Sequence, residues 1–371
     1  MLPAHVDADN WQEGPANRWA YQHVDEVVET TVVRRGDGPV LELAPAAGPG
    51  LAGISEFLDD TCTDGLLVLR GREIVDERYL NGMTPSTRHL LQSVSKSMLG
   101  CVVGRFVEDG SLDVSRTLAS YVPRLAGSAY GDATLRQALD MAVAVAYDET
   151  YDDPASEVQM HDRVGGWRTL LDTDPRGIEE FLAGLAPTGP HGERFQYCSA
   201  NTDALAWVLE SVTGHRFADI LSSELWSRIG AEHDALITVD RRGFAMASGG
   251  VCVTLRDLAR FGRVVLDGGV GPDGQQVVPA SWLDEVRGSV DAPRLLDLPT
   301  ALADGTYRNQ FWVTADPHGC FYGVGIYGQY VWMSPQHDLV VAKLSTLPDA
   351  DAPGDWERHL DFFDRIVTQV G

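Results

Sequence analysis

Apolar runs with strand-like spacing lie near both ends of the chain. The segment GLLVLRGREIVDERYL (65–80) holds two such runs around the tripeptide at 70–72, which predicts a β-hairpin. Near the C-terminus, CFYGVGIYGQYVWMSP (320–335) and LVVAKLS (339–345) return to the same pattern. We therefore expect the two ends of the chain to build one sheet.

Helical spacing dominates the middle of the chain. In SVSKSMLGCVVGRFVEDG (93–110) apolar residues recur near helical spacing and an Asp-Gly pair closes the segment, which predicts a largely buried helix. The pattern from about residue 120 to 235 is mostly helical. The same spacing predicts two further helices, over 254–266 and 355–370. The polar and aromatic stretch 147–167 lacks this pattern, so we expect a long loop that forms a functional wall or lid.

These patterns predict an α/β fold of the α+β type, with an antiparallel sheet flanked by helices and a mostly helical inserted domain. Residues 1–125 and 250–371 are expected to form the α/β domain, and 126–249 the helical one. The first 50 residues or so, rich in Pro and Gly, are expected to wrap irregularly around the core.

Composition narrows the classes of partner. With 371 residues, 44% of them hydrophobic, the chain can bury a substantial core. Its net charge of −25 argues against nucleic acid or an anionic membrane as a partner and suits a small neutral or cationic ligand. The N-terminus resembles no signal peptide and no apolar run reaches membrane-spanning length, so we expect a cytoplasmic protein. Five scattered cysteines without a CxxC pair predict no disulfide framework, and we expect no metal and no cofactor.

The clearest chemical signal is a Ser-x-x-Lys arrangement, Ser93 to Lys96, at the start of a predicted buried helix. Positions i and i+3 share a helical face, so the amine can lie beside the hydroxyl and take its proton. Burial and the helix N-terminus both lower a lysine pKa, and free N–H groups there can stabilise an oxyanion. A chance serine before a surface lysine is the alternative. It is weakened because the chain has only one other lysine, Lys343.

Two further features lie later in the chain. Tyr197 and Ser199 follow a Gly-containing turn, and a tyrosine there could share the proton of a nucleophilic serine or simply pack as an aromatic residue. The run GVGIYGQ (323–329) formally matches GxGxxG. A strand follows it where a dinucleotide site needs a helix, so the glycines more readily indicate close approach of a ligand or another backbone.

These three features occur in the order found in one family. The sequence resembles the serine hydrolases of the class C β-lactamase and penicillin-binding-protein fold over about residues 60 to 345. Within that fold, YDETYDDPASE (147–157) and the Tyr-Cys-Ser motif are most similar to 6-aminohexanoate-dimer hydrolases and related carboxylesterases. The resemblance implies a β-lactamase/transpeptidase-like fold, and relatives suggest a homodimer.

The resemblance also implies catalytic roles. Ser93 would be the acylated nucleophile, and Lys96 and Tyr197 would share general-base and general-acid duty. The backbone N–H groups of Ser93 and Ile326 would form the oxyanion hole. Ser199 would hydrogen-bond Lys96 or the substrate.

Substrate contacts are implied for the long loop. Tyr151 would hydrogen-bond a leaving-group nitrogen, Asp162 would hold a cationic amine tail, and Trp167 would cap the pocket; the alternative for each is an ordinary loop residue. The chain has GVG (323–325) where β-lactamases carry a Lys-Thr-Gly box, and Lys343 lies too late to replace that lysine. This departure disfavours β-lactams and favours esters or amides without the matching carboxylate.

Three functions follow as hypotheses. The leading one is a serine hydrolase that cleaves a small carboxylic ester or amide, such as aminohexanoate-type amides or short-chain esters, through an acyl-serine. The second is an acyltransferase or amide synthase on the same scaffold. The third is a catalytically silent ligand-binding protein, because fold alone does not fix function.

Overall fold

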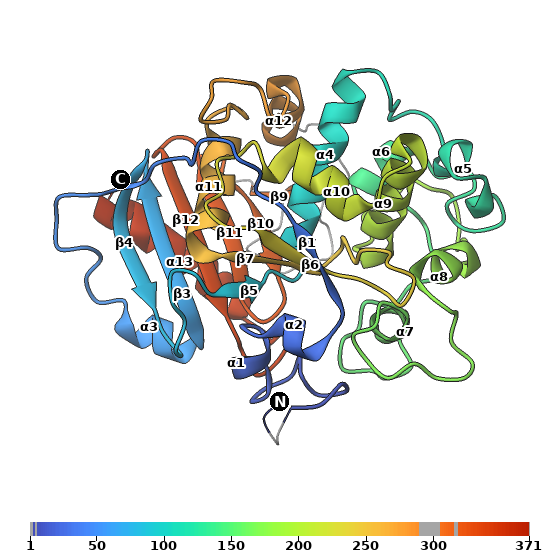
Figure 1. The fold of residues 1–371 in the computed structure, drawn as a ribbon, viewed down its shortest axis with the longest axis horizontal. Coiled ribbons are helices and arrows are strands. Elements are labelled where there is room, and N and C mark those ends of the chain that lie inside the picture. The colour runs from blue at the N-terminus through green and yellow to red at the C-terminus, as the bar shows by residue number, and fades with distance from the viewer. Residues whose placement is uncertain (1–2, 4–5, 289–304, 315–317, 371) are drawn as a thin grey trace.

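The protein, seen in a computed structural model, combines a large sheet with helices on both faces and a helical region beside it (Figure 1). The structure describes residue 3 and residues 6–288, 305–314 and 318–370. The helices are α1 (Asn17–Ala20), α2 (Val24–Val27), α3 (Ser55–Asp60), α4 (Val94–Glu108), α5 (Leu118–Tyr121), η1 (Pro123–Leu125), α6 (Leu135–Leu139), α7 (Glu157–Val164), α8 (Ile178–Gly184), α9 (Ser199–Thr213), α10 (Phe217–Leu221), η2 (Ser222–Trp226), α11 (Leu255–Leu266), α12 (Ala280–Arg287) and α13 (Asp355–Val370). The strands are β1 (Thr30–Val33), β2 (Ala44–Pro45), β3 (Thr63–Arg70), β4 (Glu73–Tyr79), β5 (Arg88–Leu90), β6 (Ala235–Thr238), β7 (Val251–Thr254), β8 (Thr306–Arg308), β9 (Phe311–Val313), β10 (Phe321–Gly325), β11 (Gln329–Ser334) and β12 (Leu339–Ser345).

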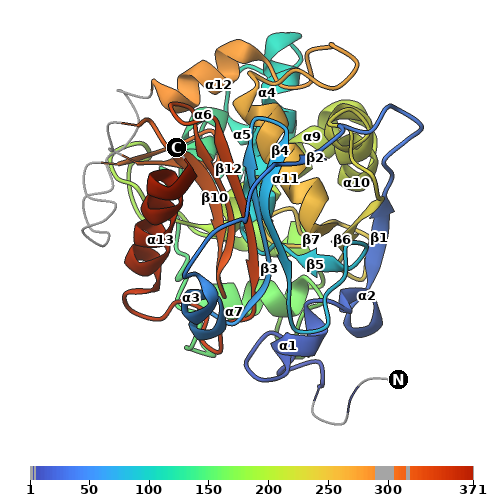
Figure 2. The same cartoon turned by 90° about the vertical axis from the view of Figure 1, so that its left-hand side faces the viewer.

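The large sheet is built from both ends of the chain, as the sequence predicts. Its order is β2-β4-β3-β12-β11-β10-β9-β8, and every pair is antiparallel except β2 with β4. The apolar side of α13 packs on one face through Phe362, Phe363 and Ile366, whereas α11 and α4 pack on the other (Figure 2). The predicted fold class, an α/β fold with a sheet between helices, is therefore confirmed.

Most of the predicted elements are confirmed, including the β3–β4 hairpin and the helices α4, α11 and α13. One prediction is wrong: the stretch 147–167 is not all loop, because its second half forms α7. The Ser156 hydroxyl accepts from the Gln159 N–H at the start of this helix, and one helical face, including Val158, is buried.

The first 50 residues are more ordered than predicted. Strand β1 pairs with β6 in a second sheet of order β1-β6-β7-β5, and β6 lies within the span 126–249 that reads as helical. Both strands have only four residues, so neither shows a long alternating pattern, and their pairing spans some 200 positions in the chain. The proposed division into two domains stays a prediction.

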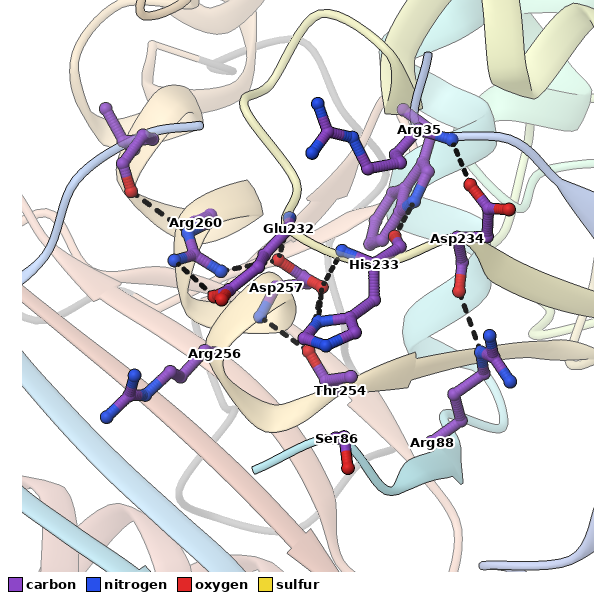
Figure 3. Close-up of polar contacts among 12 residues, drawn as sticks. Arg35, Ser86, Arg88, Glu232, His233, Asp234, Thr254, Arg256, Asp257 and Arg260 are labelled. Carbon is purple, nitrogen blue, oxygen red and sulfur yellow. Dashed lines mark hydrogen bonds and ion pairs between the residues drawn. The ribbon is translucent and has the colours of Figure 1, made fainter. Parts of the chain in front are cut away.

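A buried charge network beside this second sheet anchors α11 to its surroundings (Figure 3). Asp257, in the first turn of α11, accepts from the Glu232 N–H at 2.7 Å and from the Arg260 guanidinium at 2.7 Å. Arg260 also donates to the Leu41 carbonyl at 3.0 Å. Removing one partner would leave a buried charge unpaired, so this network holds the N-terminal segment against the body of the fold.

No helix in the described part of the chain is both long enough and apolar enough to cross a membrane.

Candidate active site

Ser93 lies at the N-terminus of α4, just after a sharp turn of the backbone. The preceding residue, Gln92, has a φ of +49°, in the left-handed region, and its amide donates to the Tyr21 hydroxyl at 2.6 Å. Ser93 takes the N-cap position, but its side chain does not cap the helix. Its hydroxyl therefore stays available for chemistry and borders two cavities.

Lys96 lies one helical turn further on and is buried. Its Nζ lies 2.8 Å from Ser93 Oγ, 3.0 Å from Ser199 Oγ and 2.7 Å from the Ser248 carbonyl oxygen. Burial lowers the pKa of Lys96 to about 8, although the charges of nearby carboxylates, Glu149 first among them, act in the opposite direction. An amine with this pKa can be neutral at a useful fraction near neutral pH and can act as a base.

Tyr197 is a second neighbour of Ser93. The Tyr197 hydroxyl is hydrogen-bonded to the side chain of Ser93. The centroid of the Tyr197 ring lies 5.2 Å from Lys96 Nζ. Burial raises the pKa of Tyr197 well above the usual value near 10, so its phenol keeps its proton at neutral pH. Tyr197 is therefore better suited to donate a proton than to remove one.

Strand β10 approaches the backbone at Ser93 closely. A Cβ at Gly325 would lie 2.6 Å from the Leu91 carbonyl oxygen and 2.9 Å from the Ser93 nitrogen, so only glycine fits there. The glycine-rich strand therefore does mark the close approach of another backbone. Within the described residues, neither the Ser93 N–H nor that of Ile326, directly after β10, donates to a backbone carbonyl. Both remain available to a developing oxyanion.

Ser199 begins α9 and joins Lys96 to a carboxylate that the sequence analysis missed. Its hydroxyl donates to Glu149 Oε1 at 2.5 Å, and its backbone N–H donates to Glu149 Oε2 at 2.9 Å. The Tyr151 hydroxyl donates to the same Oε1 at 2.9 Å. Glu149 lies in an acidic stretch, YDETYDD, where nothing in the pattern distinguishes it from its neighbours.

The two cavities beside Ser93 differ greatly in size. The wide cavity, on the side of Tyr197, has a volume of about 230 Å³, whereas the narrow cavity holds only about 30 Å³. Ser93, Tyr151 and Ile326 border both. The wide cavity is also lined by aromatic and acidic side chains, namely Glu149, Trp312, Asp351, Asp355 and Trp356. No lysine or arginine is among the described residues that line it.

Asp162 and Trp167 line the narrow cavity, and both are buried. Asp162 Oδ2 accepts from the Gln12 amide at 2.9 Å and lies 3.5 Å from the Arg168 guanidinium. Burial raises the pKa of Asp162, and Arg168 opposes this shift. Asp162 thus already has a cationic partner within the chain, while the Trp167 indole donates to Thr238 Oγ1 at 2.9 Å.

No group of three or more His, Cys, Asp or Glu side chains in the described ranges is arranged to hold a metal ion.

Comparisons with known proteins identify the family of this chain. The β-lactamase family model matches residues 49–362. A 6-aminohexanoate-dimer hydrolase from Paenarthrobacter ureafaciens is 47% identical over 350 residues, which cover 92% of this chain and 88% of that protein. A Bacillus anthracis structure, described as a candidate 6-aminohexanoate-dimer hydrolase, has a TM-score of 0.88 at 27% identity and covers 98% of this chain and 97% of its own.

A more distant structure shares the fold alone. EstCE1, described as a hydrolase with promiscuous acyltransferase activity, has a TM-score of 0.67 at 16% identity, with 85% of this chain and 97% of its own covered. The family match spans most of the chain. The chain therefore belongs to the β-lactamase family and is a hydrolase of that fold.

Proposed function

We propose that the protein cleaves a small carboxylic ester or amide through an acyl intermediate on Ser93. The observation that carries this proposal is the 2.8 Å contact between Ser93 Oγ and the Nζ of buried Lys96. A serine hydroxyl is a weak nucleophile until a neighbouring base takes its proton, and the lowered pKa of Lys96 suits that task.

In acylation, neutral Lys96 takes the Ser93 proton as Oγ bonds to the carbonyl carbon of the substrate. The carbonyl oxygen becomes an oxyanion, which the N–H groups of Ser93 and Ile326 stabilise. The tetrahedral intermediate then expels the alcohol or amine, which receives a proton from Tyr197. Tyr197 then regains its proton from Lys96. The two side chains are neighbours, since Lys96 Nζ lies 5.2 Å from the centroid of the Tyr197 ring.

Deacylation reverses these roles. Water bonds to the acyl carbon and gives its proton to Lys96, directly or through Tyr197. The acyl–oxygen bond breaks, Ser93 takes a proton back, and the carboxylic acid leaves.

The wide cavity indicates the class of substrate. Its aromatic rings, including the stacked pair Tyr197 and Trp312 with centroids 5.5 Å apart, favour an apolar chain. Its carboxylates disfavour an anionic substituent there, since no cation lines it among the described residues. Short neutral esters, and amides whose substituent on this side is neutral or cationic, fit best. Aminohexanoate-type amides remain the leading amides, with the carboxylate end placed outside this cavity.

A second candidate is acyl transfer to an amine or alcohol. The observation that favours it is the volume of about 230 Å³ directly beside Ser93, which leaves room for an acceptor larger than water. Adding an amine during turnover and comparing amide with carboxylic acid products separates transfer from hydrolysis.

Intact-mass spectrometry tests the acyl-serine step. The wild type, mixed briefly with p-nitrophenyl butyrate, should release nitrophenol and gain the mass of one butyryl group. Ser93→Ala should show neither. Release and acylation retained in Ser93→Ala would overturn the assignment of the nucleophile.

A further inference from the structure

Lys96 Nζ has three oxygen neighbours, and only two of them can remain acceptors once the amine is neutral. The ammonium form has three N–H groups, which match Ser93 Oγ, Ser199 Oγ and the Ser248 carbonyl. After one proton is lost, two N–H groups and one lone pair remain. Which neighbour faces the lone pair decides whether Lys96 can take the Ser93 proton.

Glu149 settles this choice through Ser199. A carboxylate only accepts, so the 2.5 Å contact uses the single proton of the Ser199 hydroxyl. Ser199 Oγ can then only accept from Lys96. The Ser248 carbonyl also only accepts, which leaves Ser93 as the one neighbour with a proton to give.

Two further contacts hold this arrangement in place. Glu149 Oε2 accepts a hydrogen bond from the Ser199 backbone N–H at 2.9 Å. The carboxylate therefore binds both the backbone N–H and the hydroxyl of Ser199. Ser248 is fixed by Asp203, whose carboxylate accepts its N–H and its hydroxyl, each at 2.9 Å. Both acceptors of Lys96 are therefore anchored by a carboxylate behind them.

We propose that Glu149 is a positioning residue that fixes the direction of the hydrogen bonds around Lys96, so that the lysine lone pair faces the Ser93 hydroxyl. This inference rests on the proposed acyl-serine function. Glu149 acts through Ser199 and touches neither Ser93 nor the reacting carbonyl in this role.

The negative charge of Glu149 adds a second, measurable effect. The titratable groups facing Lys96 are Glu149 from the loop before α7, with Cys198, Tyr197 and Asp203 from α9 and the segment before it. Glu149 is the strongest of the charges that raise the pKa of Lys96, against the larger effect of burial. Removing this charge lowers the pKa of Lys96 further.

The test is the pH profile of kcat/KM for p-nitrophenyl butyrate in Glu149→Gln, which keeps the shape of the side chain. The acid limb reports the free enzyme's essential base. We expect this limb to move to lower pH by about one unit, from loss of a nearby charge. We also expect the plateau to fall on the order of tenfold, because Ser199 no longer has to accept from Lys96.

Two variants sharpen the test. Ser199→Ala combined with Glu149→Gln should have the same plateau as Ser199→Ala alone, because Glu149 acts through that hydroxyl. Asp152→Asn removes an exposed carboxylate from the same loop and should leave the profile unchanged.

An acid limb that does not move in Glu149→Gln, or additive losses in the double variant, would overturn the inference and leave Glu149 a loop anchor. That failure is distinct from failure of the proposed function. If the wild type forms no acyl-Ser93 at all, the proposed function falls; if it does and the limb stays, only the role of Glu149 falls.

Discussion

Two lysines, the only ones in the chain, lie in two buried regions with different surroundings. Burial lowers the pKa of Lys96 to about 8 and that of Lys343 to about 7. Lys96 Nζ contacts three oxygens, one of them the hydroxyl of Ser93, the proposed nucleophile. Lys343 lies in β12, donates to the Ser345 hydroxyl, and has its Nζ 5.7 Å from the Phe57 ring centroid. It lines neither cavity beside Ser93.

The comparison shows that a shifted pKa does not make a base. Both amines are buried, and burial is the main cause of the lowered pKa of each. Each amine also contacts a serine hydroxyl, Ser93 for Lys96 and Ser345 for Lys343. Of these two hydroxyls, only that of Ser93 borders the two cavities beside α4, where a substrate could reach it. A lysine that is to act as a base therefore needs a partner that a substrate can reach as well as a lowered pKa.

The largest expected difference comes from replacing each lysine with methionine, which has a similar length. Lys96→Met should lose at least ~10²-fold in kcat/KM for p-nitrophenyl butyrate, because it removes the proposed general base. Lys343→Met should keep activity within about twofold, since the swap conserves volume in a buried site. Steady-state kinetics on both variants, with circular dichroism as a check of folding, measures this. Equal losses of kcat/KM in Lys96→Met and Lys343→Met would contradict the proposed difference between the two lysines.

The next largest difference concerns the hydroxyl partners of the two lysines. Ser199→Ala should lower kcat on the order of tenfold, because Lys96 then lacks one of its fixed acceptors. Ser345→Ala removes the matching partner of Lys343 and should change the free energy of unfolding by about 1 kcal/mol without changing kcat. Urea unfolding curves and turnover numbers for both variants check this pair. A drop in kcat in Ser345→Ala would connect the second lysine to the reaction.

A smaller effect should appear in the pH dependence of stability. An unfolded lysine keeps its proton up to about pH 10.5, whereas Lys343 releases its proton near pH 7 in the folded chain. The unfolded state therefore binds more protons between these values, and the free energy of unfolding rises with pH across this window. Lys343→Met should flatten that rise by up to about 1.4 kcal/mol per pH unit. The measurement is the free energy of unfolding at pH 7 and at pH 9. An equal change between the two pH values in wild type and Lys343→Met would contradict this prediction.

The smallest expected effect is at Asp162, a buried charge that already has partners. Asp162→Ala should leave turnover of neutral esters within about threefold, because Gln12 and Arg168 can bind water instead. It should reduce turnover of amides with a cationic tail more strongly if the narrow cavity receives that tail. Equal losses on both substrates would make Asp162 a structural residue.

Sequence reasoning reached the residues whose placement is local. Ser93 and Lys96 share a helical face, so their spacing alone predicts their contact. Tyr197 lies some 100 positions further along the chain, and only the family resemblance predicted it beside them. Sequence reasoning could not reach contacts formed across the fold. Gln12 meets Asp162 from 150 positions away, and Glu149 meets Ser199 from 50 positions away, and neither partner carries a sequence signal. The suggested homodimer stays a prediction.

The most direct test of the account is the rate at which wild type and Lys96→Met become acylated by p-nitrophenyl butyrate, followed by intact mass between pH 6 and pH 10. We expect the wild-type rate to rise with pH and to reach half its maximum near pH 8, the pKa of Lys96. We expect Lys96→Met to lose this rise and to react at least ~10²-fold more slowly. A wild-type rate that does not depend on pH, or equal acylation of Lys96→Met, would contradict the assignment of Lys96 as the base.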